Sequence, residues 1–281
     1  MTDRELELKA VQLRKRLLEI IFQAGAGHTG GSLSCLDILS VLYNRVLRVS
    51  PESFPDAGRD RYIQSKGHSV EALYVVLSDR GFFPDSDLDT LCQYKSPFVG
   101  HPTRKIPGIE MNTGALGHGL PISVGMAIAG KLDDATHRVF TLLGDGELAE
   151  GSNWEAAMAA SHYKLDNLIA ILDHNTLQIT GHTRDVCSNE PVDEKFRAFG
   201  WAVRLVNGHD FSELTRALTA PPERDKPTCV IANTIKGKGV SFMENNVKWH
   251  HRVPTEAELQ QALQELKQAE LHLKEHTIAR A

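Results

Sequence analysis

The sequence has few cysteines, no long hydrophobic run and no concentrated positive charge. No apolar stretch reaches the length of about eighteen residues that a transmembrane helix needs, so no membrane partner is expected. The N-terminus is charged and amphipathic and lacks the apolar core of a secretory signal. The four cysteines form no CxxC pair, which favours free thiols in a cytoplasmic protein. The net charge is −5 and no long basic run occurs, which argues against a nucleic-acid partner.

Histidine, in contrast, is abundant and has unusual neighbours. Of the 13 histidines, six directly follow a glycine, namely His28, His68, His101, His118, His182 and His209. Because glycine marks turns and close backbone approaches, several of these histidines are expected on tight loops, where binding residues tend to lie. His118, His182 and His209 are better explained as structural residues than as catalytic ones.

The spacing of apolar residues predicts an α/β fold. Helices are expected at residues 4–24, 35–47, 70–79, 122–131, 153–163, 195–199 and 211–218. Strands are expected near the start of 61–69 and at 138–143, 167–172, 201–206 and 228–234. Glycine-rich loops are expected at 25–34 and 81–119. Apolar strands that alternate with helices indicate a parallel β-sheet flanked by helices on both faces.

One domain is expected to span residues 1–281, because no repeat, low-complexity segment or interdomain linker interrupts the chain. Its last predicted element is a helix from about residue 255, introduced by the capping box Thr255 to Glu258. One face of this helix carries Leu259, Leu263, Leu266 and Leu273. Docking of that face on the core is the first interpretation, and contact with a partner helix is the second.

An acidic residue lies between two glycines where a predicted strand ends. Asp145, in the segment GDGELAEG, follows one strand, and Asn175 follows the next strand along the chain. Neighbouring parallel strands lie about 4.8 Å apart, so these two side chains could share one cation beyond the carboxyl ends of the strands. Magnesium prefers such oxygen donors and commonly shares them with a diphosphate. Gly146 and the helix expected from Gly151 would offer backbone N–H groups to that anion. A simple turn or cap role for Asp145 is the alternative.

This spacing of GDG and Asn175 resembles the thiamine-diphosphate-binding signature, and other segments resemble transketolases. The segments that carry the resemblance are GAGHTGGSLS, SKGHS, FVGHPT, NTGALGHGL, GDGELAEGSNWEAA, NLIAILDHNTLQITG and IANTIKGKGVSFMENNVKWHH. Together they cover nearly the whole chain. The resemblance implies a thiamine-diphosphate-binding fold and, within it, the domain that grips the diphosphate.

The resemblance also implies a role for particular residues. The ligands of Mg²⁺, or of another divalent cation such as Ca²⁺ or Mn²⁺, would be Asp145, Asn175 and the carbonyl of Leu177. The groups that hold the diphosphate would be His68, the backbone of Gly146 and His250. The residues that line the thiazolium site would be Gly114, Ala115 and Leu116. The residues that contact the sugar near its reacting carbon would be His28, His101 and His250. The acidic residues that link cofactor sites across a subunit interface would be Glu150 and Glu155.

The sequence departs from the family pattern at a few positions. Ala115 replaces a frequent proline, His118 replaces a common glutamine, and His174 lies between Asp173 and Asn175 in place of the usual pair of asparagines. The segment KGKG at 236–239 is also similar to deoxyxylulose-phosphate synthases. The adjacent pair of histidines at 250 and 251 leaves open which ring faces the site, and the first is favoured.

The family resemblance implies an N-terminal subunit of a split transketolase. Such an enzyme transfers a two-carbon ketol unit from a ketose phosphate to an aldose phosphate. The chain has about half the length of a full-length enzyme, so we expect a separately encoded C-terminal subunit, which would bind the pyrimidine, in an α2β2 assembly. One alternative is a half-enzyme of the deoxyxylulose-phosphate-synthase or 2-oxoacid-dehydrogenase type. A non-catalytic paralogue with a binding or regulatory role is the other.

Overall fold

The central element is a five-stranded sheet in which every strand pair is parallel. The computed structural model describes the backbone of residues 1–278 and the side chains of residues 1–275. The strand order is β1 (Arg61–Gln64), β2 (Val139–Gly144), β3 (Leu168–His174), β7 (Thr228–Asn233) and β6 (Ala202–Asn207). A small antiparallel pair, which was not predicted, joins β4 (Leu177–Gln178) to β5 (Gly181–His182). The parallel sheet predicted from the sequence is therefore confirmed.

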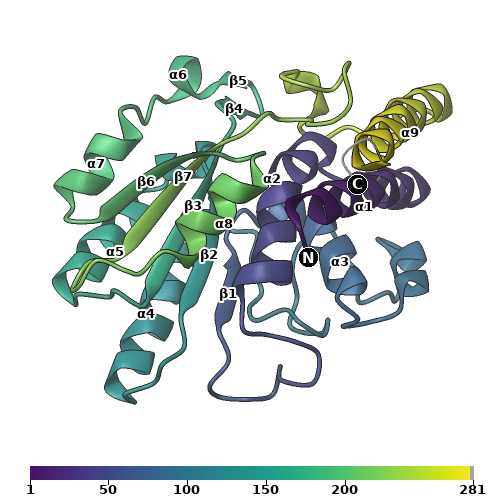
Figure 1. Ribbon diagram of the computed structural model, residues 1–281. Coiled ribbons are helices and arrows are strands. Elements are labelled where there is room, and N and C mark those ends of the chain that lie inside the picture. Colours follow the sequence, from purple (N-terminus) through teal and green to yellow (C-terminus); the bar gives the residue numbers. More distant parts are fainter. Residues whose placement is uncertain (279–281) are drawn as a thin grey trace.

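Helices cover both faces of this sheet, as Figure 1 shows. The helices are α1 (Asp3–Ala24), α2 (Thr29–Val41), α3 (Val70–Asp79), α4 (Gly119–Leu132), α5 (Gly151–His162), α6 (Thr183–Val186), α7 (Val192–Ala198), α8 (Phe211–Thr219) and α9 (Glu256–Ile278). Alternate residues of β3 point to opposite faces, as a strand requires. Ile169 and Ile171 join the core formed with α1, α2, α3 and α8. Leu168, Ala170 and Leu172 join a second core with α4, α5 and α7.

The glycine-rich stretch that was predicted as a loop is largely helical. Helix α2 begins at Thr29 and continues into a π-helical turn, Leu42–Val46. All thirteen residues of α2 are buried, so its glycines serve close packing more than turn formation. A Cβ atom on Gly30 would lie 2.7 Å from the backbone oxygen of Trp249. The helix starts six residues earlier than predicted because tertiary contact, and not local propensity, decides there.

The last helix docks on the core, as first expected. Thr255 and Glu258 form the predicted capping box, with reciprocal bonds of 2.8 and 3.3 Å between the side chains and the backbone N–H groups. Leu259 and Leu266 are buried, and Leu263 packs against the same core. Figure 1 shows α9 beside α1, so the first and the last helix of the described residues pack together. Within the part of the chain that the structure describes, no helix is long and apolar enough to cross a membrane.

Candidate functional site

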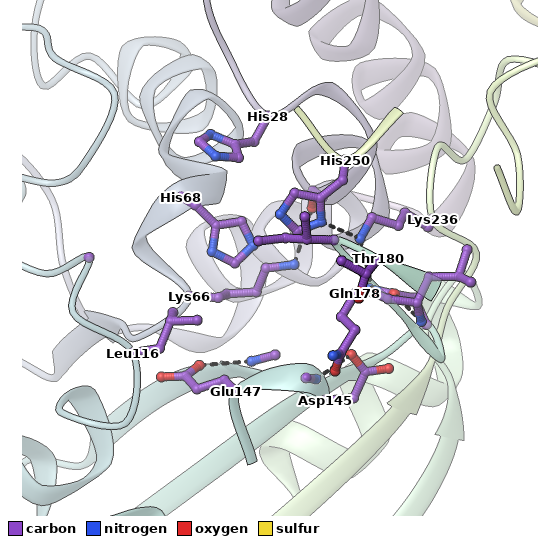
Figure 2. Close-up of a pocket in the computed structure, with 17 residues that line it drawn as sticks. His28, Lys66, His68, Leu116, Asp145, Glu147, Gln178, Thr180, Lys236 and His250 are labelled. Atoms are coloured by element: carbon purple, nitrogen blue, oxygen red, sulfur yellow. Dashed lines mark hydrogen bonds between the residues drawn. The ribbon is translucent and has the colours of Figure 1, made fainter. Parts of the chain in front are cut away.

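A cavity of about 420 Å³ lies at the carboxyl ends of β2 and β3. Nine of the residues predicted from the sequence line it, and Figure 2 shows how its labelled side chains converge. These nine are His28, His68, Gly114, Leu116, Asp145, Gly146, Asn175, Leu177 and His250. The predicted residues outside the lining are His101, Ala115, Glu150 and Glu155. The fold therefore brings most of the expected site together from segments far apart in the chain.

Asp145 stands directly after β2 with both carboxylate oxygens engaged by the backbone. One oxygen accepts the N–H of Gly146 at 2.7 Å, and the other accepts the N–H of Thr176. The side chain is 5% exposed. Burial, together with the nearby charge of Asp173, raises the pKa of Asp145 to about 6. A buried carboxylate whose charge is unfavourable in this way is suited to bind a cation.

Both polar atoms of the Asn175 side chain form hydrogen bonds. Its Nδ2 donates to Ser34 Oγ at 3.2 Å and to Asp173 Oδ2 at 3.3 Å, and its Oδ1 accepts the N–H of Leu177 at 3.1 Å. With Asp145 and the Leu177 carbonyl, this gives three oxygen donors in the cavity wall. Among the described residues, no cluster of three His, Cys, Asp or Glu side chains that could hold a metal occurs. A cation here would need further oxygens, as a diphosphate supplies.

Two buried lysines at the same end of the cavity were missed from the sequence. Lys66 forms an ion pair with Asp173. Lys236 is 2% exposed and donates to the Leu177 carbonyl at 2.9 Å and to His250 Nδ1 at 2.8 Å. Among residues 1–275, no carboxylate lies within ion-pair distance of Lys236. Burial and the charge of Lys66 lower the pKa of Lys236 to about 8.

Lys236 therefore carries a buried positive charge that no carboxylate of the described residues pairs with directly. A buried charge without a counterion is unfavourable, and the three oxygen donors and Lys236 would suit a cation and a polyanion bound together. The residues present fit a metal–diphosphate group. The only sequence signals for the two lysines were the segments SKGHS and KGKG, which show no burial by themselves.

Glu147 is a third functional residue that sequence reasoning missed. It is 2% exposed, and its carboxylate accepts the N–H groups of Gly144 and Gly117, each at 3.0 Å, and the hydroxyl of Ser65. These partners lie in three separate segments: Gly144 ends β2, Ser65 follows β1, and Gly117 precedes α4. Glu147 therefore connects those segments, and its position directly after the GDG segment was the available signal.

Four other histidine rings surround that of His28. Its ring centroid lies 5.3 Å from His68, 6.1 Å from His101, 5.8 Å from His250 and 4.5 Å from His251. Both adjacent histidines of the pair thus contact His28. Only His250 lines the cavity and contacts Lys236, whereas His251 is exposed. Of the two adjacent histidines, His250 is therefore the one that lies in the wall of this cavity.

Burial lowers the pKa of His28, His68, His101 and His250 and so favours their neutral forms. Burial and the neighbouring His251 lower the pKa of His28 to about 4. Burial and the charge of Lys236 lower the pKa of His250 to about 3, and burial also lowers that of His101. The Nδ1 atom of His28 is buried without a partner. Neutral rings can donate and accept hydrogen bonds, so the cluster is suited to hold sugar hydroxyls.

The predicted residues outside the lining differ in how far they lie from it. His101 packs against Gly114, where a Cβ atom would lie 2.5 Å from the His101 ring and where φ is +138°. Ala115 is exposed beside it. Glu150 and Glu155 are exposed at the start of α5, and the 3-10 turn Gly146–Ala149 separates that helix from Asp145. A role for these two glutamates across a subunit interface stays a prediction.

Glu71, on α3, holds the start of α2 and so the backbone of His28. Its Oε1 accepts the N–H of His28 at 3.1 Å, and its Oε2 accepts the hydroxyl of Ser32 at 2.8 Å. Burial raises the pKa of Glu71 to about 7, against these hydrogen bonds. The Glu71 carboxylate, on α3, thus stabilises the N-terminus of α2.

This raised pKa predicts a pH dependence of stability that Glu71→Gln removes. The pKa of Glu71 in the folded state lies above the ordinary 4.5. Its contribution to the stability of the fold is therefore full below pH 4.5 and is lost as the pH rises to about 7. The free energy of unfolding of the Gln variant relative to wild type should therefore rise by up to about 3 kcal/mol between pH 4.5 and 8. Urea unfolding at the two pH values measures this, and an equal difference at both would contradict it.

Comparisons with known proteins agree with this geometry. The family described as transketolase, thiamine diphosphate binding domain, matches residues 7–272. A subunit of the apulose-4-phosphate transketolase of Phocaeicola vulgatus is 50% identical over 93% of this chain and 93% of its own length. A subunit of the 6-deoxy-6-sulfo-D-fructose transketolase of Clostridium sp. is 41% identical over 95% of this chain and 98% of its own.

The fold is also that of solved transketolases. The structure of transketolase from Campylobacter jejuni matches with a TM-score of 0.85 and 31% identity. The match covers 98% of this chain and 48% of the other, so the chain spans about half the length of that transketolase. The chain therefore belongs to the transketolase family and carries its thiamine diphosphate binding domain.

Proposed function

We propose that residues 1–281 act as one domain, the N-terminal subunit of a two-subunit transketolase. The enzyme would transfer a two-carbon ketol unit from a ketose phosphate to an aldose phosphate. The observation that carries this is the meeting, in one cavity, of Asp145, Asn175 and the Leu177 carbonyl with the unpaired Lys236 and the neutral histidines. The relatives named as transketolase subunits have nearly the same length as this chain, which supports a separately encoded partner.

Within this proposal, the chain holds the metal and the diphosphate. Asp145, Asn175 and the carbonyl of Leu177 ligate Mg²⁺, or Ca²⁺ or Mn²⁺ in its place, and the diphosphate oxygens complete the coordination. Lys236, with no carboxylate partner of its own, neutralises part of the diphosphate charge. The other groups that hold the diphosphate are His68, His250 and the backbone of Gly146.

The remaining residues hold the sugar and the reactive ring. Gly114, Ala115 and Leu116 line the thiazolium site. When bound, the thiazolium supplies the nucleophilic carbon and the electron sink that ketol transfer needs. His28, His101 and His250 hold the substrate hydroxyls through neutral hydrogen bonds and accept a proton as charge develops.

The assembly and setting belong to the same proposal. A C-terminal, pyrimidine-binding subunit completes the site, in an α2β2 heterotetramer. The four cysteines are free thiols, two of them exposed, which favours the reducing cytoplasm. Pentose phosphates are the first sugars to assay. Apulose 4-phosphate belongs beside them, because two relatives are named for it.

A ketol-transfer assay on histidine variants tests this function. His28→Ala and His101→Ala should lower the turnover of a ketose phosphate by about 10²- to 10⁴-fold, the cost of one lost proton-transfer group. Cofactor affinity should change little, because this proposal assigns both histidines to the sugar and not to the diphosphate. The assay uses the chain with its partner subunit, and His162→Ala, on the exposed end of α5, is the matched control. Unaltered turnover in both variants would remove these histidines from the reaction.

A further inference from the structure

We propose that a buried triad, formed by Arg14, Asp37 and His209, is a positioning device for Lys236. The three residues come from α1, from α2 and from the turn before α8, and none of them lines the cofactor cavity. The proposal goes beyond the proposed function, and it rests on that function only for its last step, the effect on cofactor affinity. His209, which was interpreted from the sequence as purely structural, thereby gains a defined role.

Asp37 is the centre of the triad. Its side chain is 4% exposed, and its Oδ2 accepts Arg14 at 2.7 Å and His209 Nδ1 at 2.8 Å. Burial alone would raise the pKa of this carboxyl, but the Arg14 guanidinium and the hydrogen bonds outweigh it and hold the pKa at about 2. Asp37 is therefore a permanent anion that only accepts hydrogen bonds.

Because Asp37 cannot donate, the proton of His209 lies on Nδ1. The other ring nitrogen, Nε2, is then free to accept, and it accepts the backbone N–H of Ile235 at 2.8 Å. Ile235 directly precedes Lys236 in the chain. The carboxylate thus sets the orientation and tautomer of a ring that holds the backbone on one side of Lys236.

Arg14 holds the backbone on the other side of Lys236. Its Nε donates to the carbonyl of Lys238 at 3.0 Å while its terminal nitrogen pairs with Asp37. Between the two anchors, the N–H of Gly237 donates to the carbonyl of Gly30 in α2 at 3.0 Å. The segment 235–239 is therefore fixed to the same carboxylate from both ends.

Lys236 lies between these anchors, and its side chain lines the cavity beside His250 (Figure 2). In this structure its ammonium group lies within 3 Å of the Leu177 carbonyl oxygen and of His250 Nδ1. A long side chain that carries a buried charge has many rotamers, so a fixed backbone limits where that charge can lie. Loss of the triad should release the segment and misplace the charge.

Hydrogen–deuterium exchange on the full chain tests the positioning without any ligand. In His209→Leu and in Asp37→Leu, amide exchange in the peptide that spans 235–239 should be at least about tenfold faster. His209→Leu keeps the Arg14–Asp37 pair, so it provides a readout even if Asp37→Leu fails to fold. The controls are His137→Leu and Asp60→Leu. Asp60 is buried and paired with two arginines at the amino-terminal end of the sheet.

Calorimetry with Mg²⁺ and thiamine diphosphate tests the consequence. His209→Leu should weaken cofactor binding about tenfold, as the loss of an outer partner does at metal sites, and His137→Leu should not. In a Lys236→Ala background, His209→Leu should add less than about twofold, because both changes act on one charge. A fully additive effect would show that the triad acts elsewhere.

The outcomes separate this proposal from the proposed function. Unchanged exchange at 235–239 in both triad variants overturns the positioning role, whatever the cofactor does. Faster exchange with unchanged affinity in His209→Leu also overturns it, because Lys236 would then not depend on the triad. Wild-type chain that binds no cofactor contradicts the proposed function, and the exchange result then still decides whether the triad fixes the segment.

Discussion

Asp145→Ala is expected to abolish magnesium-dependent binding of thiamine diphosphate. Asp145 is the only carboxylate among the three oxygen donors in the cavity wall, and its charge is disfavoured by burial and by Asp173. Removing the anion from such a site leaves the metal and Lys236 with excess positive charge. Loss of a buried, hydrogen-bonded charge partner typically costs about 2–5 kcal/mol, so the affinity should fall at least about 30-fold.

Calorimetry with both ligands measures this effect, and thermal unfolding checks the fold. Without ligands, Asp145→Ala should be about as stable as wild type. In the ligand-free wild type the buried carboxylate of Asp145 is not stabilised by a cation, so its removal costs little. The matched control is Asp166→Ala, which removes an acid at the amino-terminal end of β3, where Asp166 pairs with Lys131. Unchanged affinity of Asp145→Ala would remove Asp145 from the site.

The residues that could be predicted from the sequence are those placed by local rules. Asp145 and Asn175 follow apolar strands, and parallel strands that neighbour each other put their carboxyl ends at one edge. Lys66, Lys236 and Glu147 could not be predicted in the same way. Their role depends on burial and on which charges remain unpaired, and both are properties of the folded chain.

The start of α2 and the role of His209 show the same limit. Glycines at 30 and 31 indicate a loop by local propensity, yet the packing of Trp249 against the helix decides their conformation. His209 follows a glycine like five other histidines, and nothing local connects it with Asp37, which lies 172 residues away. Local pattern predicted the sheet and the positions of Asp145 and Asn175 at its edge, whereas long-range contacts determine the start of α2 and the partners of His209.

The purified chain is expected to be inactive alone and active only with a partner subunit. The resemblance to transketolases implies a glutamate that binds the pyrimidine ring of the cofactor. The cavity lining contains one glutamate, Glu147, whose carboxylate already accepts Gly144, Gly117 and Ser65. No lining glutamate among the described residues is therefore free for the pyrimidine, and we expect the proposed partner subunit to supply one.

A two-carbon transfer assay between xylulose 5-phosphate and ribose 5-phosphate, with Mg²⁺ and thiamine diphosphate, measures this dependence. The chain alone should turn over below about 1% of the mixed rate, since a missing proton-transfer group costs about 10²- to 10⁴-fold. Titration with a candidate C-terminal transketolase subunit should raise the rate until the two are equimolar. The same partner mixed with Asp145→Ala should stay inactive, which assigns the activity to this chain's cofactor site. Full turnover by the chain alone would contradict the two-subunit proposal, because every catalytic group would then have to come from the residues around this one cavity.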